Sequence, residues 1–173
     1  MARFAEFDVG LLMRLHGTHK VSFDSVRIMA INCYALDLAA YPLFMDGTHS
    51  DKEGKTMAVY EELLTSQLLA LAIALRTKFY QGADPQETIK YVLPCGLLYK
   101  FKSGNEENAI FSIKDVCDKI IHADTIYRDM EKGVQKPITT LSGKQGEFKW
   151  ELHLSVSLFA EAILNWIQDI PST

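Results

Sequence analysis

The spacing of apolar residues changes near residue 130, and this change constrains the fold more than any other feature of the chain. Before it, apolar residues recur every three or four positions, which is the spacing of helices that bury one side. After it, Phe148, Trp150, Leu152 and Leu154 alternate with polar residues, which is typical of a half-buried strand. The pattern predicts a mainly α-helical chain with a β-hairpin late in the sequence.

The predicted helices include two long ones, at 24–41 and 57–81, with Pro42 and Gly82 expected to end them. Shorter helices are predicted at 4–15, from Asp84 to about 94, at 112–124 and at 159–170, with loops at 46–55 and 102–108. The predicted core includes Leu68, Leu71, Ile73, Leu75, Ile120, Ile121, Trp150 and Trp166.

The predicted hairpin joins a short strand at 138–141 to the strand at 148–154, with residues 143–146 as its turn. A final amphipathic helix follows. Because the chain has 173 residues and no repeat or long linker, residues 1–173 are predicted to form one domain. The predicted fold class is a helical bundle with one late β-hairpin and a C-terminal helix.

Composition limits the function classes that the chain can belong to. Hydrophobic residues make up 48% and charged residues 23%, so a packed core is expected. A net charge of -4 gives no general attraction to nucleic acid or to an anionic membrane. The longest wholly apolar run, at 68–75, is too short to span a bilayer, and Glu6 and Asp8 interrupt any signal peptide. We therefore expect a cytoplasmic protein without a membrane partner.

The metal-ligating residue types form no strong site in the sequence. The cysteines are odd in number and lack CxxC spacing, which indicates buried free thiols and no zinc knuckle. Histidines and acids in two loops could satisfy zinc only if the loops met, and polar loop residues are the simpler interpretation. No metal and no other cofactor is predicted. The histidines and acids in the two loops are His16, His19, Asp46, His49 and Asp51.

The helix at 112–124 has an apolar stripe and a polar stripe. The polar stripe contains Asp115, Asp118, Lys119 and His122 at offsets i, i+3, i+4 and i+7. A carboxylate beside an imidazole can orient it for proton transfer, so Asp118 and His122 are candidate catalytic residues. The alternative is a solvated face with an ordinary pair worth about 0.2–0.5 kcal/mol. Cys117 lies on the apolar stripe, where a thiol is inert.

Residues 117–122, CDKIIH, resemble the signature helix of the HEPN superfamily of small helical domains. The family pattern is Arg, a polar residue, a few further residues and His, so Asp118 and His122 take the last two roles. The resemblance implies a helical bundle and a homodimer. In the best-known members it also implies a metal-independent ribonuclease in which two motifs meet. Cys117 stands where the family has arginine. Lys119 could supply a positive charge there, but an ammonium cannot make the bidentate contact that a guanidinium makes.

Three functions follow from these residues. The first is a HEPN-like protein that binds nucleic acid or a nucleotide with weak or no ribonuclease activity, linked to toxin–antitoxin or phage-defence systems and to an antitoxin-like protein partner. The alternative is a non-enzymatic interaction module that dimerises. The third is an active ribonuclease using His122, Asp118 and Lys119. The sequence leaves catalysis open because of Cys117, and a basic cleft around His122 would favour the first and third functions.

Overall fold

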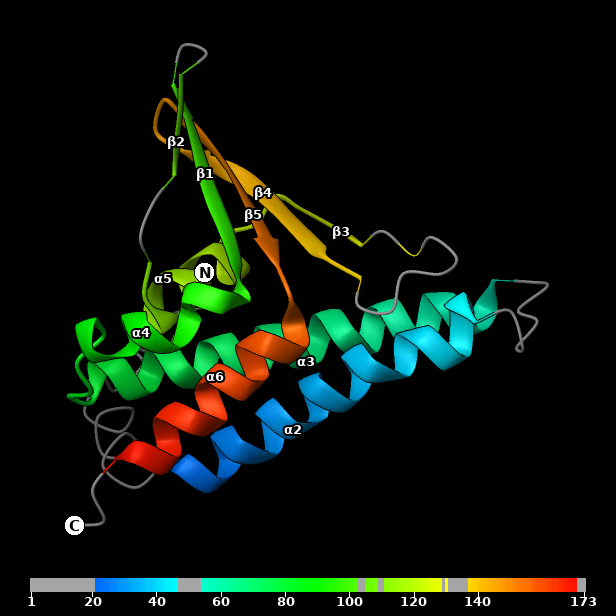
Figure 1. The fold of residues 1–173 in the computed structure, drawn as a ribbon, viewed down its shortest axis with the longest axis horizontal. Helices are drawn as coiled ribbons and strands as arrows, with labels where there is room; N and C mark the ends of the chain where they lie inside the picture. Colours follow the sequence, from blue (N-terminus) through cyan, green and yellow to red (C-terminus); the bar gives the residue numbers. More distant parts are fainter. Residues whose placement is uncertain are drawn as a thin grey trace, which may run out of the picture.

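Two long antiparallel helices lie side by side and carry a β-sheet above them (Figure 1). They are α2 (Phe23–Ala40) and α3 (Lys55–Tyr80), close to the predicted bounds. The mainly helical prediction is confirmed for the part of the chain that is described. The computed structural model describes residues 21–46, 54–102, 105–108, 111–128, 130 and 137–170, so the helix predicted at 4–15 and most of the loop predicted at 46–55 lie outside it.

Helix α2 begins where the side chain of Ser22 accepts a hydrogen bond of 3.0 Å from the backbone N–H of Ser25. The α-helix ends at Ala40, two residues before Pro42, as predicted, and Pro42 itself lies in one π-helical turn, Tyr41–Met45. A proline ring clashes with the carbonyl four residues earlier in an α-helix, and the wider turn relieves this clash. The turn closes with the N–H of Asp46 donating to the carbonyl of Tyr41 at 3.0 Å.

Helix α3 is apolar around most of its circumference, but only one side of it packs. Leu68, Leu71 and Leu75 are at most 1% exposed on the side that meets α2 and α5. Ile73 is 51% exposed, so its predicted place in the core is wrong. Periodicity cannot select the buried side of a helix when both sides are apolar. The helix ends before Gly82, whose φ of 113° lies in the region that favours glycine.

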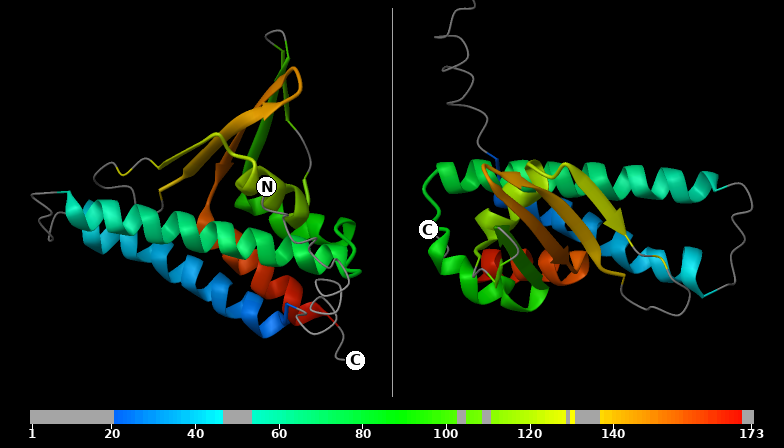
Figure 2. Two further views of the ribbon diagram at one scale, coloured as in Figure 1. Left: turned by 180° about the vertical axis from the view of Figure 1, so that it is seen from behind. Right: turned by 90° about the horizontal axis from the view of Figure 1, so that it is seen from above.

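The segment after α3 starts as predicted and ends in a strand. Asp84 accepts a hydrogen bond of 2.9 Å from the N–H of Gln86, and three short helical turns follow before Gly96. The remaining α-helices are α5, which packs on α3, and α6, which packs on α2 (Figure 2). The bounds are η2 Gln86–Thr88, α4 Ile89–Val92, η3 Leu93–Cys95, α5 Ile113–Ile121 and α6 Val156–Asp169.

The sheet has five antiparallel strands in the order β2-β1-β5-β4-β3. The prediction of a single hairpin therefore accounts for only two of these strands. The hairpin β4–β5 is confirmed, but both strands gain neighbours from earlier in the chain. The strands are β1 (Gly96–Lys102), β2 (Asn105–Asn108), β3 (Thr125–Arg128), β4 (Thr139–Gln145) and β5 (Phe148–Leu154).

The two missed edge strands have a common physical explanation. The loop prediction for 102–108 is wrong because β2 lies within that range and pairs with β1. The sequence of β2 is NEEN, which has no apolar alternation to reveal a strand. Edge strands such as β2 and β3 are short, and backbone hydrogen bonds to their neighbours place them without a hydrophobic pattern.

The turn of the β4–β5 hairpin lies at Gly146 and Glu147, not across 143–146 as predicted. Gly146 has a φ of 61°, which suits a tight turn. Gly143 is instead inside β4 and directly opposite Trp150. A Cβ at Gly143 would lie 2.5 Å from the Trp150 ring, so the glycine makes room for the indole. The remaining predicted core residues are Ile121, which is half-buried, and Leu68, Leu71, Leu75, Ile120, Trp150 and Trp166, which are buried.

Two helical segments are long and apolar enough to cross a membrane by length and composition alone. They are Phe23–Met45 and Lys55–Tyr80, and each is only partly buried, where it packs against the other and against α5 or α6. Core helices of proteins in water pass the same test, so a cytoplasmic location stays a prediction.

Candidate functional site

Helix α5 has the two faces that the sequence predicts. Ser112 caps its start and Asp115 completes the capping box, with the Ser112 N–H donating to Asp115 Oδ2 at 2.8 Å. Val116, Cys117 and Ile120 are buried against α3 and the sheet. His122 is the last cap residue, and its backbone N–H donates to the carbonyl of Asp118 at 3.1 Å.

The carboxylate of Asp118 is engaged by two cations. Its Oδ1 lies 2.6 Å from Nη1 of Arg76, and its Oδ2 lies 3.0 Å from Nζ of Lys114. Among the described residues, no hydrogen bond joins this carboxylate to the imidazole of His122, which is exposed at the helix end. The structure therefore places the predicted pair on one face without making Asp118 the partner that orients His122.

Arg76 of α3 brings a guanidinium to the polar stripe that sequence reasoning missed. Besides its ion pair with Asp118, it donates a hydrogen bond to the hydroxyl of Tyr80 and lies over that ring at 5.2 Å. The hydrogen bond to Tyr80 raises the pKa of Arg76, and the charge of Asp118 adds to this effect. The available signal for Arg76 was a charged residue near the end of an apolar helix. Its partner Asp118 lies on α5, so no local spacing in the sequence connects the two residues.

A cleft of about 520 Å³ opens beside α5, between α3 and the sheet. Four cationic side chains from four different elements line it: Arg76 of α3, Lys100 of β1, Lys119 of α5 and Lys144 of β4. The two acids that line it are both engaged, Asp118 by Arg76 and Asp115 in the capping box. The cleft therefore has an excess of positive charge despite the acidic chain. It is completed by Leu98, Phe111, His122, Gln145 and Trp150.

Lys119 is half-buried in this cleft. Its Nζ donates to Oε1 of Gln145 at 3.0 Å and lies 4.6 Å above the centre of the Trp150 ring. Burial lowers the pKa of Lys119, and repulsion from Lys100 lowers it further. Two ammonium groups that repel each other inside a cleft are a favourable setting for an anion between them.

Cys117 cannot take part in chemistry in this cleft. Its side chain is fully buried on the opposite face of α5, and burial raises the pKa of its thiol far above the ordinary value. The predicted core role of this residue is confirmed. The other two cysteines, Cys33 and Cys95, are buried free thiols as well.

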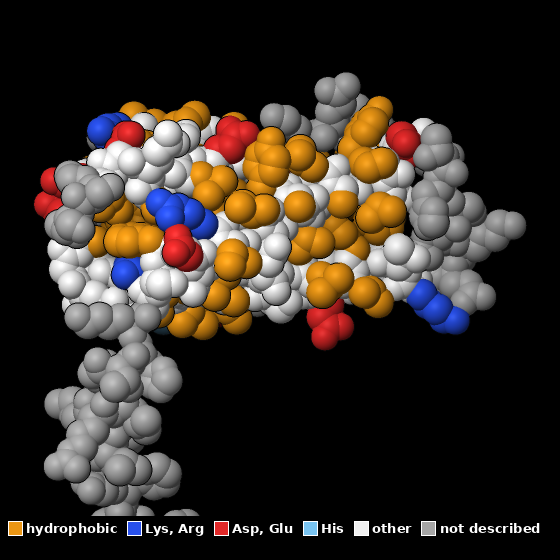
Figure 3. All heavy atoms as spheres, turned by 90° about the horizontal axis from the view of Figure 1, so that it is seen from below, with side chains coloured by type: hydrophobic (Ala, Val, Ile, Leu, Met, Phe, Trp, Pro, Cys, Tyr) orange, Lys and Arg blue, Asp and Glu red, His pale blue; other side chains and the backbone are white. Residues whose placement is uncertain are grey.

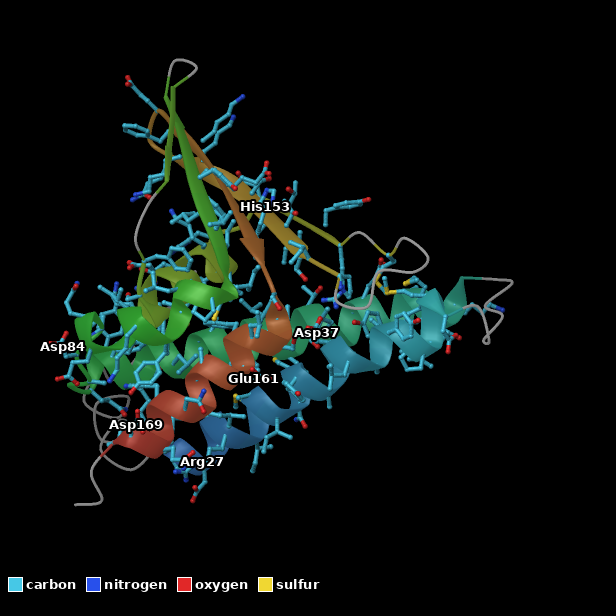
Figure 4. The ribbon with its side chains drawn as sticks, viewed as in Figure 1. Arg27, Asp37, Asp84, His153, Glu161 and Asp169 are labelled. Carbon is cyan, nitrogen blue, oxygen red and sulfur yellow. The ribbon has the colours of Figure 1, made fainter. Side chains whose placement is uncertain are left out.

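A second polar cluster is buried where α2, α6 and the sheet meet (Figure 4). Asp37 forms an ion pair with Arg128, and these side chains are 2% and 5% exposed. Arg128 also donates to Oγ1 of Thr139 at 2.9 Å. Sequence reasoning missed this pair, although Asp37 lies on the buried stripe of α2 and could have signalled it. The burial of both charges indicates a structural role.

A larger cavity, of about 1030 Å³, shows no comparable chemistry. It lies between the start of α2 and the ends of α3 and α6, with Phe23 and Trp166 in its wall. Its cations, Lys78 and Lys90, are balanced by three acids, and Tyr91 donates to Asp169 at 2.6 Å.

No group of three metal-ligating side chains occurs among the described residues. Of the loop residues weighed for a metal, only Asp46 is described, and His16, His19, His49 and Asp51 lie outside the described ranges.

Comparisons with known proteins leave the geometry to carry the functional argument. No family model matches the chain, and no curated protein or solved structure matches it. The arrangement around α5 can bind an anion through Lys100 and Lys119, and His122 at its rim can exchange a proton.

Proposed function

We propose that this protein is a HEPN-like domain that binds nucleic acid or a nucleotide in the cleft beside α5, with weak or no ribonuclease activity. The observation that carries this proposal is the cleft itself, which is lined by four cations together with the one histidine of the sequence motif. The same resemblance connects the protein to toxin–antitoxin or phage-defence systems and to an antitoxin-like partner.

The charge balance of the cleft supports binding of phosphate groups. Four cations line the cleft against two acids, and Asp118 already pairs with Arg76 and Lys114, so a positive excess remains although both acids still attract Lys119. Ammonium groups bind phosphate oxygens through charge-assisted hydrogen bonds. The whole chain is acidic, so this excess of positive charge is a local property of the cleft and not of the chain as a whole.

The arrangement favours binding over cleavage. Ribonuclease chemistry needs a proton-transfer group and a cation that stabilises charge on phosphorus in the transition state. His122 could move a proton, but Asp118 is engaged with Arg76 and Lys114 instead of orienting the imidazole. Arg76 is itself held by Asp118 and Tyr80, and Cys117 faces the core. The cations are thus better placed to hold a phosphate than to activate one.

The test measures RNA binding and RNA cleavage with the same variants. A fluorescently labelled mixed RNA pool should bind the wild type, with an affinity that falls as salt rises. Lys119→Gln should weaken binding about tenfold, the loss of one charge-assisted contact. The matched control is Lys55→Gln, because Lys55 is exposed at the first residue of α3, at the other end of that helix from Arg76 and the cleft. Equal affinities for all three proteins would contradict the proposal.

The cleavage arm uses His122→Ala. We expect little RNA cleavage by the wild type, and the same low level in His122→Ala. Because His122 is exposed, the folding midpoint of the variant should also stay close to that of the wild type. Robust cleavage that is lost in His122→Ala would overturn the binding proposal in favour of an active ribonuclease.

A further inference from the structure

The two long helices expose an apolar face on the side away from the sheet. On α2 the exposed residues Ile28, Ile31, Ala35 and Leu38 follow helical spacing and form one stripe. Figure 3, which views the molecule from below, shows hydrophobic side chains over much of this surface. We call it the α2–α3 face, and its α3 stripe consists of the exposed Val59, Leu63 and Ile73 with the exposed Ser66 and the half-buried Ala70 between them.

These residues are exposed well beyond what scattered surface residues would explain. Ile28 is 60% exposed, Ile31 54% and Val59 57%, and they share one face instead of being dispersed. Contiguous apolar surface of this kind marks an interaction site on most proteins. The buried stripes of the same helices are already occupied by α5 and α6, so the α2–α3 face is an additional surface.

The size of the face approaches what a stable dimer needs. The helices contain 18 and 26 residues, so at about 1.5 Å per residue they extend about 27 and 39 Å. Two adjacent helices, each about 10 Å across, then present roughly 500–800 Å². A stable interface buries about 800 Å² on each partner.

From this face we infer that the protein binds a second copy of itself through α2 and α3, which leaves the two clefts on opposite outer sides of the dimer. The sheet and α5 lie above the helices, and the α2–α3 face lies below them (Figures 1 and 3). This arrangement differs from the one that the HEPN resemblance implies, in which two motifs meet in one site. It does not depend on which ligand the cleft binds.

A lipid surface is the competing occupant, since both helices are long and apolar enough to span a membrane. Membrane-surface helices usually carry lysine or arginine along the border of the apolar face. The exposed charges bordering this face are of both signs, Asp24 with Arg27 on α2 and Lys55 with Glu62 on α3, which favours a protein partner.

The first test measures the mass of the full chain by light scattering at tens of micromolar. We expect a dimer for the wild type and a monomer for Ile31→Asp. The matched control is Leu97→Asp, because Leu97 is 53% exposed on β1, away from the face, and should leave the dimer intact. A monomeric wild type, or a dimer that survives Ile31→Asp, would overturn the inference. So would a wild type that is monomeric in solution and binds phosphatidylglycerol vesicles.

The second test locates the interface by disulfide cross-linking under mild oxidation. The native cysteines are all buried, so a new exposed cysteine reports on its own position. Ala35→Cys, Ser66→Cys or a mixture of the two should give covalent dimers, while His122→Cys should not. Cross-linking at His122→Cys alone would show that the two clefts meet, and cross-linking by none of these variants would exclude the α2–α3 face.

Discussion

The carboxylate of Asp37 in α2 accepts a hydrogen bond of 2.8 Å from the backbone N–H of Ser157 in α6. The residue at the usual capping position, Ser155, makes no side-chain cap bond of its own. Asp37 therefore satisfies the start of a helix that lies 120 residues further along the chain. Its other oxygen pairs with Arg128 of β3, so one carboxylate joins α2 to both α6 and the sheet.

Replacing Asp37 with alanine should therefore destabilise the protein severely. It would leave the Arg128 guanidinium buried without its counter-ion and the start of α6 without its acceptor. Breaking a buried ion pair in this way lowers the free energy of unfolding by about 3–5 kcal/mol. Urea denaturation measures the loss. The control Asp24→Ala removes an exposed pair with Arg27 and should cost less than about 1 kcal/mol. Similar losses in both variants would contradict the structural role.

The contrast between α5 and Asp37 shows which part of the structure a sequence can predict. The capping box of Ser112 and Asp115 and the buried face of α5 are local, because every partner lies within one or two turns. The partners of Asp37 lie on β3 and α6, and no spacing rule connects them. Local patterns therefore predicted the helices well and the tertiary ion pairs not at all.

The candidate site follows the same division. The polar stripe of α5 was visible in the sequence, and the structure keeps Lys119 and His122 on one cleft. Arg76 and Lys100 reach that cleft from α3 and β1, so the charge that defines it depends on the fold. The sequence also placed Asp118 beside His122, but it could not show that Arg76 competes for the same carboxylate.

The three cysteines should be unreactive in the folded protein. Only the thiolate reacts with a disulfide reagent. Burial raises the pKa of Cys33 and of Cys95 to about 12, and burial also raises that of Cys117. We expect almost no reaction with Ellman's reagent at pH 8, and reaction of all three thiols in denaturant. Ala35→Cys is the control, because its exposed thiol should react at once.

Anion binding in the cleft should weaken as the pH rises toward the ordinary lysine value of about 10.4. In the free protein, burial and Lys100 lower the pKa of Lys119, so it loses its proton earlier than other lysines. A bound phosphate favours the ammonium and raises that pKa, so binding takes up a proton. Affinity is therefore full below the free-state pKa and falls above it. Fluorescence anisotropy with labelled RNA between pH 7 and about pH 10 measures this change.

The control for this pH dependence is Lys119→Arg. A guanidinium stays charged across the whole range, so this variant should keep its affinity to higher pH than the wild type. The groups that act on Lys119 come from α5 itself and from the sheet, and none of them changes in this comparison. They are Asp115 and Asp118 of α5, Lys100 of β1 and Gln145 of β4. Parallel pH profiles for the two proteins would exclude Lys119 as the titrating group.

Gly143→Ala should disturb the floor of the cleft. A Cβ at this position would lie 2.5 Å from the Trp150 ring and 3.0 Å from the backbone carbonyl of His122. Both neighbours are held in place, the ring by Lys119 above it and the carbonyl by the end of α5. Overpacking of this kind lowers the free energy of unfolding by about 1–3 kcal/mol.

Urea denaturation followed by tryptophan fluorescence measures this loss, and near-ultraviolet circular dichroism of the folded variant reports any movement of Trp150. Lys144→Ala is the matched control, because its side chain is exposed on the same strand and should change stability by no more than about 0.5 kcal/mol. A Gly143→Ala variant as stable as this control, with an unchanged near-ultraviolet spectrum, would show that the indole has room to move. The glycine would then be needed neither for Trp150 nor for the position of His122.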